Sequence, residues 1–321
     1  MSLLIYAESA EGKFKKVAFE LASYAKKVAE SLGTTVTAVT INAGDVSELA
    51  KYGVDKVLKV KNEALTGFSA KAYADIIKQA AKKEGAKVVV LSSTTDSIYL
   101  SSLVAVGLDA GFASNVVGLP VSTNPFQVKR TAFSNKAFTI TEITTDVKVL
   151  GLAKNSYGII ENNVSLTEED FNPTIDAADF SVKVTAVEKS SGKIAIADAD
   201  IVVSGGRGLK GPENWGMIEE LASVLGAATA CSKPVSDLGW RPHGEHVGQT
   251  GKPVATNLYI AIGISGAIQH IAGINSSKVK VVINNDPEAP FFKVADYGVV
   301  GDAFEIVPQL IEKLKAFKAQ H

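Results

Sequence analysis

The 321-residue chain has few of the residue types on which disulfide-linked, metal-dependent and thiol-dependent proteins rely. It contains one cysteine, Cys231, and four histidines. A single thiol excludes an internal disulfide, and these few residues do not give the spacing of a structural zinc site. His243 and His246 flank Glu245, which leaves a weak adventitious metal site as an alternative, but we expect both and His321 to be solvated. We predict a protein of a reducing compartment, with no resident metal and a buried, unreactive Cys231.

A charge excess of one sign and long apolar runs are also missing. The formal net charge is -1, so the chain as a whole attracts neither nucleic acid nor an acidic membrane surface. Short runs such as Lys82-Lys83 indicate solvated helix faces. No window approaches about 18 unbroken apolar residues, and no basic segment precedes the apolar start of the chain. We expect no nucleic-acid partner, no membrane insertion, no signal peptide and a cytoplasmic location.

Apolar runs that alternate with amphipathic helical stripes fill the first half of the chain. Strands are expected at 3–7, 36–41, 57–60 and 88–91, and helices at 14–32, 70–83 and 98–108. This alternation predicts a parallel sheet with crossover helices. From 121 to 160, shorter alternating runs rich in Thr, Val and Phe predict antiparallel strands added at the edge of that sheet.

Polar and acidic residues separate this half from a second series of strands and helices. They occupy 168–179 and are followed by Ser190-Ser191-Gly192, which places the domain boundary near residue 192. The second series is expected to have strands at 201–204, 227–230, 258–264 and 279–283, and helices at 213–225, 266–272 and 303–318. The predicted fold class is α/β, with domains 1–192 and 193–321 each forming an open, mostly parallel sheet with flanking helices.

A glycine-rich loop opens the second series. Gly206–Gly211 matches G-x-G-x-x-G between a strand and a helix, which is typical of a dinucleotide-binding turn. A Rossmann domain of a nicotinamide-dependent oxidoreductase is one interpretation. It also requires an acidic residue at the end of the next strand to bind the ribose, whereas Cys231 is followed by Ser232 and Lys233. Arg207 within the loop favours a phosphate or flavin contact, and a purely structural turn is the other alternative.

Three further polar segments follow apolar runs, where open α/β sheets bind ligands. They are Val247–Lys252 (VGQTGK), Gly263–His270 (GISGAIQH) and Asn284–Pro290 (NNDPEAP). The glycines permit close backbone approach, and the prolines of the last segment fix its backbone. The sequence shows no nucleophile–base–acid triad, so it indicates a carrier rather than an enzyme that transforms a substrate. A nucleotide-binding interaction protein is a further alternative.

These motifs occur together, and in this order, in one known family. Gly205–Lys210, the three segments above and Val294–Gly298 closely resemble the FAD-binding half of the alpha subunit of electron transfer flavoproteins. The resemblance covers most of the chain and is most specific after residue 200. It implies an adenine-nucleotide-hydrolase-like first domain at the subunit interface, without its own nucleotide, and a Rossmann-like FAD-binding second domain. It also implies a beta-subunit partner that carries AMP or a second FAD.

The same resemblance assigns cofactor-binding residues. It implies that Thr250 reaches the flavin near N5 and O4, that His270 lies at the O2 edge, and that Asn284 and Asp302 meet the pyrophosphate and adenosine side. Lys233 stands where the family usually has arginine, so it keeps the charge but loses the planar fork; Ser232 and Lys233 are also compatible with a simple helix start. The full expected set is Arg207, Ser232, Lys233, Val247, Gly248, Gln249, Thr250, Ser265, Gly266, Ala267, Ile268, Gln269, His270, Asn284, Asp302 and Ala303.

The function that the resemblance implies is electron transfer. The family accepts electrons from flavin dehydrogenases, such as the acyl-CoA dehydrogenases of fatty acid β-oxidation, and delivers them to the respiratory chain through a membrane quinone oxidoreductase. Such a carrier transforms no substrate of its own, so no catalytic residue is expected.

Overall fold

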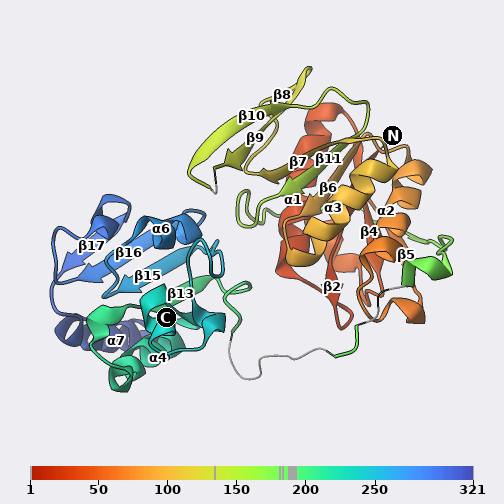
Figure 1. Ribbon diagram of the computed structural model, residues 1–321. Helices are drawn as coiled ribbons and strands as arrows, with labels where there is room; N and C mark the ends of the chain where they lie inside the picture. The colour runs from red at the N-terminus through yellow and green to blue at the C-terminus, as the bar shows by residue number, and fades with distance from the viewer. Residues whose placement is uncertain (1, 134, 181, 183, 187–193, 321) are drawn as a thin grey trace. The chain divides into compact units, whose positions relative to one another are not determined.

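The chain divides into two compact units, each built on its own sheet. The computed structural model describes residues 2–133, 135–180, 182, 184–186 and 194–320. One unit comprises residues 1–133 with 137–187, and the other comprises residues 188–321 with 134–136. Both are sheets flanked by helices (Figure 1). The boundary predicted at residue 192 lies outside the described residues, so the division into domains 1–192 and 193–321 stays a prediction.

The first unit contains a ten-stranded, mostly parallel sheet. Its order is β10-β9-β7-β11-β6-β1-β4-β5-β12, and β8 pairs with β9. The strands are β1 (Ser2–Tyr6), β4 (Thr35–Ile41), β5 (Lys56–Val60), β6 (Val88–Ser92), β7 (Gly111–Val116), β8 (Ser122–Thr123), β9 (Phe126–Ala132), β10 (Ala137–Glu142), β11 (Lys148–Leu152) and β12 (Thr167–Asp170). The α-helices are α1 (Lys16–Leu32), α2 (Ala70–Glu84) and α3 (Thr95–Gly107), and a hairpin pairs β2 (Ser9–Ala10) with β3 (Lys13–Phe14).

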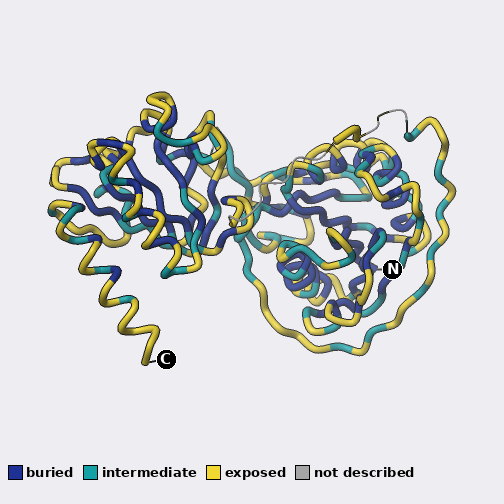
Figure 2. Tube along the Cα trace, turned by 90° about the horizontal axis from the view of Figure 1, so that it is seen from below, coloured by how far each residue is buried: buried dark blue, intermediate teal, exposed yellow. Residues whose placement is uncertain are grey.

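Helices cover both faces of this sheet because its central strands are apolar on both faces. Leu3 of β1 packs in the core that includes α1, and its neighbour Leu4 packs in the opposite core with α2 and α3. Strands buried on both faces are typical of parallel sheets with crossover helices. The helices α1 and α2 end, as predicted, at Gly33 and Gly85, each of which adopts the left-handed conformation. Figure 2 shows the buried strands running through each unit.

The segment after α3 differs from the prediction in two strands, because β7 was not predicted and β11 is not antiparallel. The strands β9 and β10 form the expected antiparallel hairpin at the sheet edge. In contrast, β11 is parallel to its neighbours and lies between β7 and β6. Residues 149–152 of this strand are all buried. A continuous apolar run of this kind is typical of the centre of a parallel sheet. The prediction grouped it with the antiparallel strands because it follows the hairpin directly in the sequence.

The acidic segment that was expected to separate the domains begins with a strand of the first unit. Strand β12 pairs with β5 in parallel. Glu169 lies 2.7 Å from Lys56 Nζ and 2.8 Å from Lys83 Nζ. Hydrogen bonds from these two lysines lower the pKa of Glu169 to about 2. Because charge pairing rather than an apolar face places β12, apolar periodicity could not reveal it.

The second unit contains a five-stranded, fully parallel sheet in the order β14-β13-β15-β16-β17. The strands are β13 (Ile201–Gly205), β14 (Ala228–Cys231), β15 (Leu258–Ile262), β16 (Val279–Asn284) and β17 (Tyr297–Val300). The α-helices are α4 (Gly216–Leu225), α5 (Lys233–Asp237), α6 (Ile268–Ile274) and α7 (Ala303–Gln320). The prediction missed β17, because every residue of this edge strand is exposed and no buried face gives it a period. Within the described part of the chain, no helix has both the length and the apolarity needed to cross a membrane.

The strand order of the second unit reverses at β13. The chain passes from β13 to β14 on one side and then crosses to β15 on the other side. In open α/β sheets, ligands bind at the carboxyl ends of the strands, next to the point where the order reverses. The topology therefore predicts a ligand site at the loops after β13 and β15.

Candidate functional site

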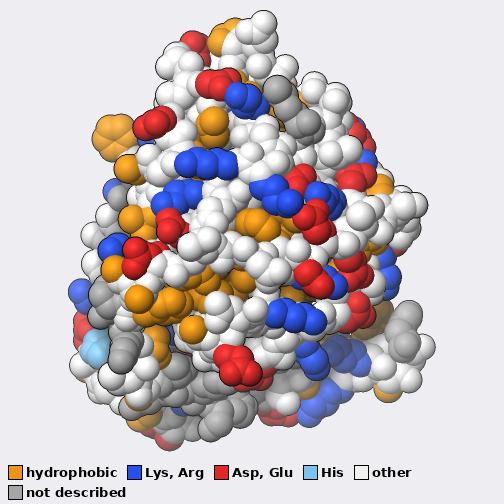
Figure 3. All heavy atoms as spheres, turned by 90° about the vertical axis from the view of Figure 1, so that its right-hand side faces the viewer, with side chains coloured by type: hydrophobic (Ala, Val, Ile, Leu, Met, Phe, Trp, Pro, Cys, Tyr) orange, Lys and Arg blue, Asp and Glu red, His pale blue; other side chains and the backbone are white. Residues whose placement is uncertain are grey.

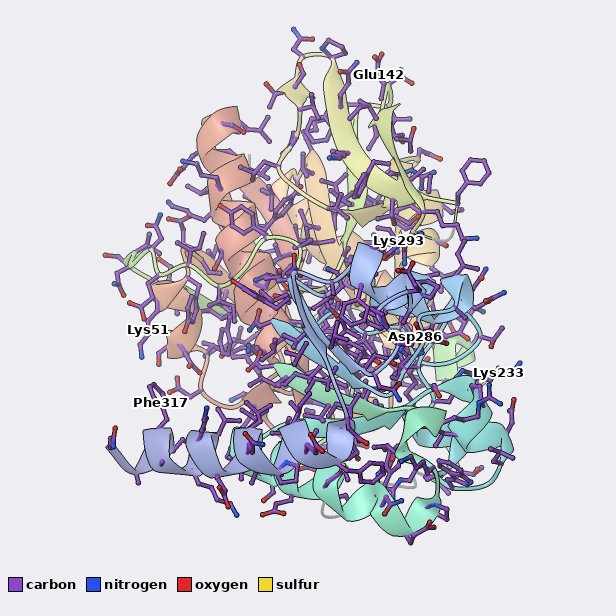
Figure 4. All side chains as sticks on the ribbon, turned by 90° about the vertical axis from the view of Figure 1, so that its left-hand side faces the viewer. Lys51, Glu142, Lys233, Asp286, Lys293 and Phe317 are labelled. Carbon is purple, nitrogen blue, oxygen red and sulfur yellow. The ribbon has the colours of Figure 1, made fainter. Side chains whose placement is uncertain are left out.

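The strand ends of the second unit lie at one edge of its sheet. The register places Gly205 beside Cys231 on one side and beside Ile262 on the other. The loops that follow β13, β14 and β15 therefore begin next to one another, at the same end of the sheet. Figure 4 shows Lys233, from the segment after β14, and Asp286, from the loop after β16, at this end of the strands.

The loops after β13 and β15 meet through their backbones. Gly206 N donates to Ile262 O at 2.9 Å, and Gly208 N donates to Gly263 O at 3.1 Å. A Cβ atom on Gly206 would lie 2.1 Å from Gly263 O, and one on Gly208 would lie 2.7 Å from Gly263 Cα. Gly263 has a φ of 63°, in the left-handed region that favours glycine. Two glycines of the G-x-G-x-x-G motif thus allow the backbones of two strand-end loops to pack directly against each other.

Arg207 lies between these two glycines and is exposed. Among the residues that the structure describes, its guanidinium makes no hydrogen bond or ion pair. Lys210, at the end of the same loop, has a φ of 68°, and its Nζ lies 4.8 Å from the centre of the Phe304 ring. The lysine therefore has an aromatic neighbour, whereas the planar donors of Arg207 are available to an anion.

Strand β14 ends in a buried thiol followed by an exposed lysine. Cys231 is buried, and its burial raises the pKa of the thiol to about 12, so it is not a thiolate at neutral pH. This agrees with the unreactive cysteine that we predicted. Ser232 is buried, its N donates to Gly205 O at 3.1 Å, and its hydroxyl makes no capping hydrogen bond to α5. Lys233 is the first residue of α5 and is exposed.

The loop Val247–Lys252 packs against α6. Gln249 N donates at 2.7 Å to the carbonyl of the second residue of α6. A Cβ atom on Gly273 of α6 would lie 2.6 Å from Gly248 Cα, so the two backbones are in contact. The side chains of Gln249 and Thr250 remain exposed. Glycine is needed here for packing, and the packing holds two polar side chains at the surface.

The helix α6 begins at Ile268, two residues later than predicted. Gly266 has a φ of 88°, and a Cβ atom there would lie 2.6 Å from Phe291 N. The same Phe291 N donates to Ser265 O at 3.0 Å. This turn is fixed by backbone contacts, while the side chains of Ser265 and Gln269 are exposed.

His270 is a buried, neutral residue of α6. Its Nε2 lies 2.9 Å from the hydroxyl oxygen of Tyr259 on β15, and its Nδ1 has no hydrogen-bond partner among the described residues. The centre of the Phe291 ring lies 6.2 Å from the centre of the imidazole ring. Burial, with a smaller effect of His246, lowers the pKa of His270 to about 4. The side chain can therefore offer a hydrogen bond at neutral pH, but not a positive charge.

His246 corrects one sequence-based expectation, because it is buried rather than solvated. It forms an isolated parallel β-bridge with Cys231, and its carbonyl oxygen accepts a hydrogen bond of 2.8 Å from Lys252 N. A Cβ atom on Gly251 would lie 2.9 Å from the His246 ring, so the ring fills the space that this glycine leaves. Burial lowers the pKa of His246. Sequence reasoning also missed Tyr259. Its hydroxyl lies inside an otherwise apolar strand and needs a buried hydrogen-bond partner, and this need was the signal that could have revealed its role.

Asn284 and Asp302 are engaged with the chain itself. Asn284 Nδ2 donates to Ile264 O at 3.0 Å, and its Oδ1 accepts from Asp286 N at 3.0 Å. The buried amide thereby joins the loops after β15 and β16. Asp302 Oδ1 accepts from Phe304 N at 2.9 Å at the start of α7. Both side chains hold the edge of the site in shape.

The predicted site residues fall into an exposed and a buried group, all on segments at this edge. The exposed residues are Arg207, Lys233, Gln249, Thr250, Ser265, Ala267, Ile268, Gln269 and Asp302, and the buried ones are Ser232, Val247, Gly248, Gly266, His270, Asn284 and Ala303. The exposed group provides two cations, two hydroxyls, two primary amides and the carboxylate of Asp302. These are groups that bind a charged, hydrogen-bonding ligand.

Neither a catalytic triad nor a metal site is supported near this edge by the described residues. Ser236 Oγ lies 3.0 Å from His243 Nδ1, but Ser236 is buried. The neighbouring carboxylate of Glu245 accepts two hydrogen bonds of 2.8 and 2.7 Å from Arg241. No cluster of three potential metal ligands occurs in the described ranges.

Comparison with known proteins identifies the family. The family model for the electron transfer flavoprotein domain matches residues 3–188, and the model for the electron transfer flavoprotein FAD-binding domain matches residues 195–275. The chain belongs to the electron transfer flavoprotein family. The second unit is accordingly the FAD-binding domain of an alpha subunit, and the chain is a redox carrier protein. The FAD cofactor, the α/β fold with two mostly parallel sheets and the carrier role predicted from the sequence are confirmed.

Full-length relatives extend the similarity over almost the whole chain. The alpha subunit of Thermoanaerobacterium thermosaccharolyticum is 36% identical, with 98% of each chain covered. The alpha subunit of Bacillus subtilis is 34% identical, covering 98% of this chain and 97% of its own length. The probable mitochondrial alpha subunit of Caenorhabditis elegans is 36% identical, covering 98% of this chain and 93% of its own length.

The residues present fit FAD. Exposed cations suit its pyrophosphate, and exposed hydroxyls and amides suit a polar ring edge. The unpartnered Nδ1 of buried His270 is a further polar atom that lacks a partner within the described chain. The nicotinamide alternative is not supported, because β14 is followed by Ser232 and Lys233 rather than by the acidic residue that binds a ribose.

The glycine contact can be tested with Gly263→Ala. The substitution adds the left-handed strain of about 1 kcal/mol and a Cβ atom 2.9 Å from Gly208 Cα. We expect roughly 2–4 kcal/mol lower stability in urea unfolding and weaker FAD binding. Gly226→Ala is the matched control, because Gly226 has a φ of 66° and nothing within 4 Å of its added Cβ. Equal losses in the two variants would contradict the contact.

The neutral state of His270 predicts a pH dependence of stability. Its folded pKa of about 4 is below the usual 6.5. The stabilisation from the neutral ring is therefore complete above pH 6.5 and is lost as the pH falls from 6.5 through 4, by about 3 kcal/mol in total. Urea unfolding of His270→Gln should show a correspondingly smaller loss between pH 7 and 4.5 than the unsubstituted protein. Parallel curves would show that the imidazole is not held neutral.

Proposed function

We propose that this chain is the FAD-holding subunit of a heterodimeric electron carrier. It accepts electrons from flavin dehydrogenases, such as the acyl-CoA dehydrogenases of fatty acid β-oxidation, and passes them to the respiratory chain through a quinone oxidoreductase. The observation that carries the proposal is the set of exposed cations, hydroxyls and amides at one sheet edge, beside the unreactive thiol of Cys231. When bound, FAD supplies the reversible electron uptake that these side chains lack. A cytoplasmic location remains a prediction from the sequence.

We assign the cationic part of the FAD site to Arg207 and Lys233. Both are exposed at the carboxyl edge of the sheet. Arg207 can bind an oxygen pair through its planar donors, and its glycine neighbours hold the loop against β15. Lys233 offers a compact ammonium, which attracts negative charge without the stacking of an arginine.

Neutral polar groups complete the proposed site. The exposed side chains of Thr250, Ser265 and Gln269 can bind the polar edge of the flavin ring. His270 contributes a neutral imidazole whose Nε2 is turned to Tyr259. Asn284 acts indirectly, because its amide joins two of the loops. The remaining residues of the predicted set, including Val247, Gly266 and Ala303, shape the backbone of the edge.

The assignment of Arg207 predicts the effect of one substitution. Arg207→Ala should remove a charge-assisted contact and weaken FAD binding by roughly 10- to 150-fold. FAD titration, followed by flavin fluorescence with the beta subunit present, measures the change. Lys278→Ala is the control, because it removes one exposed positive charge just before β16, at the opposite edge of the sheet. An unchanged affinity in Arg207→Ala would make the glycine loop a structural turn only.

We also propose that the first unit binds the beta subunit through α3. This helix buries Leu100 and Val104 against its own sheet. On its outer side, Tyr99 is 63% exposed and Val106 is 79% exposed, together with Ile98 and Leu103. Figure 3 shows exposed hydrophobic side chains gathered among charged ones on the side of the molecule that it views. A helix with large apolar side chains on its outer side as well as on its inner side needs a second partner, and a subunit interface provides one.

A charge placed on this face should weaken the heterodimer. Val106→Asp would bury an unpaired carboxylate in the interface, and we expect the dissociation constant to rise by at least about tenfold. Analytical ultracentrifugation of the chain mixed with the beta subunit measures this constant. Phe317→Asp, at a 58% exposed position of α7 in the other unit, is the control. If both variants bind the beta subunit equally well, the interface lies elsewhere.

A further inference from the structure

The first unit has a reversal of strand order of its own. Strand β1 pairs with β4 on one side and with β6 on the other, and α1 connects β1 to β4. The second unit repeats this arrangement with β13, β14 and β15. By the rule that locates ligands in open α/β sheets, each unit has one favoured crevice, at the carboxyl ends of the two strands where the order reverses.

The two crevices carry opposite charges at equivalent positions. Glu8 is the second residue after β1, and Arg207 is the second residue after β13. Arg207 is exposed, and its side chain has no hydrogen-bond or ion-pair partner among the described residues. Glu8 is buried, with 2% of the residue exposed. A buried acidic side chain thus lies at the strand reversal of the first unit, and an exposed cation lies at that of the second unit.

The carboxylate of Glu8 is surrounded by donors. Its Oε1 accepts hydrogen bonds of 2.8 Å from both Thr94 Oγ1 and Ser97 Oγ, and it also accepts from Ser92 Oγ. Its Oε2 lies 3.1 Å from Lys15 Nζ. Thr94 is the N-cap of α3 and Ser97 lies in the first turn, so the positive end of the helix dipole faces the same point. Three hydroxyls and an ammonium at a helix start are the groups that would otherwise bind a phosphate.

We propose that Glu8 is the specificity-determining residue that closes the first unit to nucleotide phosphates and confines cofactor binding to the second unit. The carboxylate satisfies the donors that a phosphate would need, and it repels a second anion at the same place. Because it is part of the chain, it occupies the crevice without the entropy loss of binding a free ion. The chain therefore has one cofactor-binding unit, although both units have the topology of one.

The experiment removes the internal anion and supplies an external one. Glu8→Ala leaves the three hydroxyls without this acceptor, and it leaves Lys15 with the more distant carboxylate of Asp96, whose Oδ2 lies 3.9 Å from its Nζ. Glu8→Gln fills the same space without charge. Thermal unfolding is measured for the full chain in sodium phosphate and in sodium chloride of equal ionic strength. We expect phosphate, at about ten times its dissociation constant, to raise the Tm of Glu8→Ala by roughly 3–6 °C over chloride. The unsubstituted chain and Glu8→Gln should show no such difference.

Direct binding provides a second readout that is independent of FAD. The ³¹P resonance of inorganic phosphate should broaden on addition of Glu8→Ala, and not on addition of the unsubstituted chain. If Glu8→Ala does not fold in either salt, Glu8→Ser takes its place in both measurements. The proposal is overturned if neither variant responds to phosphate more than the unsubstituted chain does. It is also overturned if Glu8→Gln responds as strongly, since the effect would then not depend on an emptied crevice.

Discussion

The backbone contact between the loops after β13 and β15 is the constraint on which the FAD-binding unit depends. Gly206 and Gly208 lie so close to Gly263 that no side chain fits between them. This contact fixes two strand-end loops against each other where the strand order reverses, with the exposed Arg207 between two anchored glycines. The motif therefore acts first on the protein's own packing, and its value for a ligand follows from the side chains that the packing leaves exposed.

The two units show how one topology serves different purposes. Each has a central strand, a crossover helix and a reversal of strand order, beside which open α/β sheets bind ligands. In the second unit the strand ends at the reversal carry exposed cations and hydroxyls, and the domain binds FAD. In the first unit the buried carboxylate of Glu8 meets its own ring of donors. A charge of opposite sign at one equivalent position is a small change in sequence with a large effect on which anions can enter.

The histidines show why a motif does not fix the chemistry of its residues. The sequence predicts that His270 lies in a flavin-binding segment, but its pKa depends on burial beside the Val247–Lys252 loop and against Tyr259. His246 matches no motif and was expected in solvent, yet Gly251 leaves the space that its ring fills. Burial disfavours the charged imidazole at both positions. The protonation states thus follow from contacts between segments that the sequence separates.

The sequence by itself determined the α/β class, most of the strands and helices, the helix ends at Gly33 and Gly85, and the FAD family, and it predicted the segments to which the proposed site is assigned. These features are encoded locally, in apolar periodicity, glycine positions and short motifs. The tertiary structure alone decided the central place of β11, the charge-paired β12, the exposed β17 and the contacts of Tyr259 and Glu8. Each of these depends on which distant residue lies opposite, and a pattern read along one strand carries no information about its partner across the sheet or beneath it.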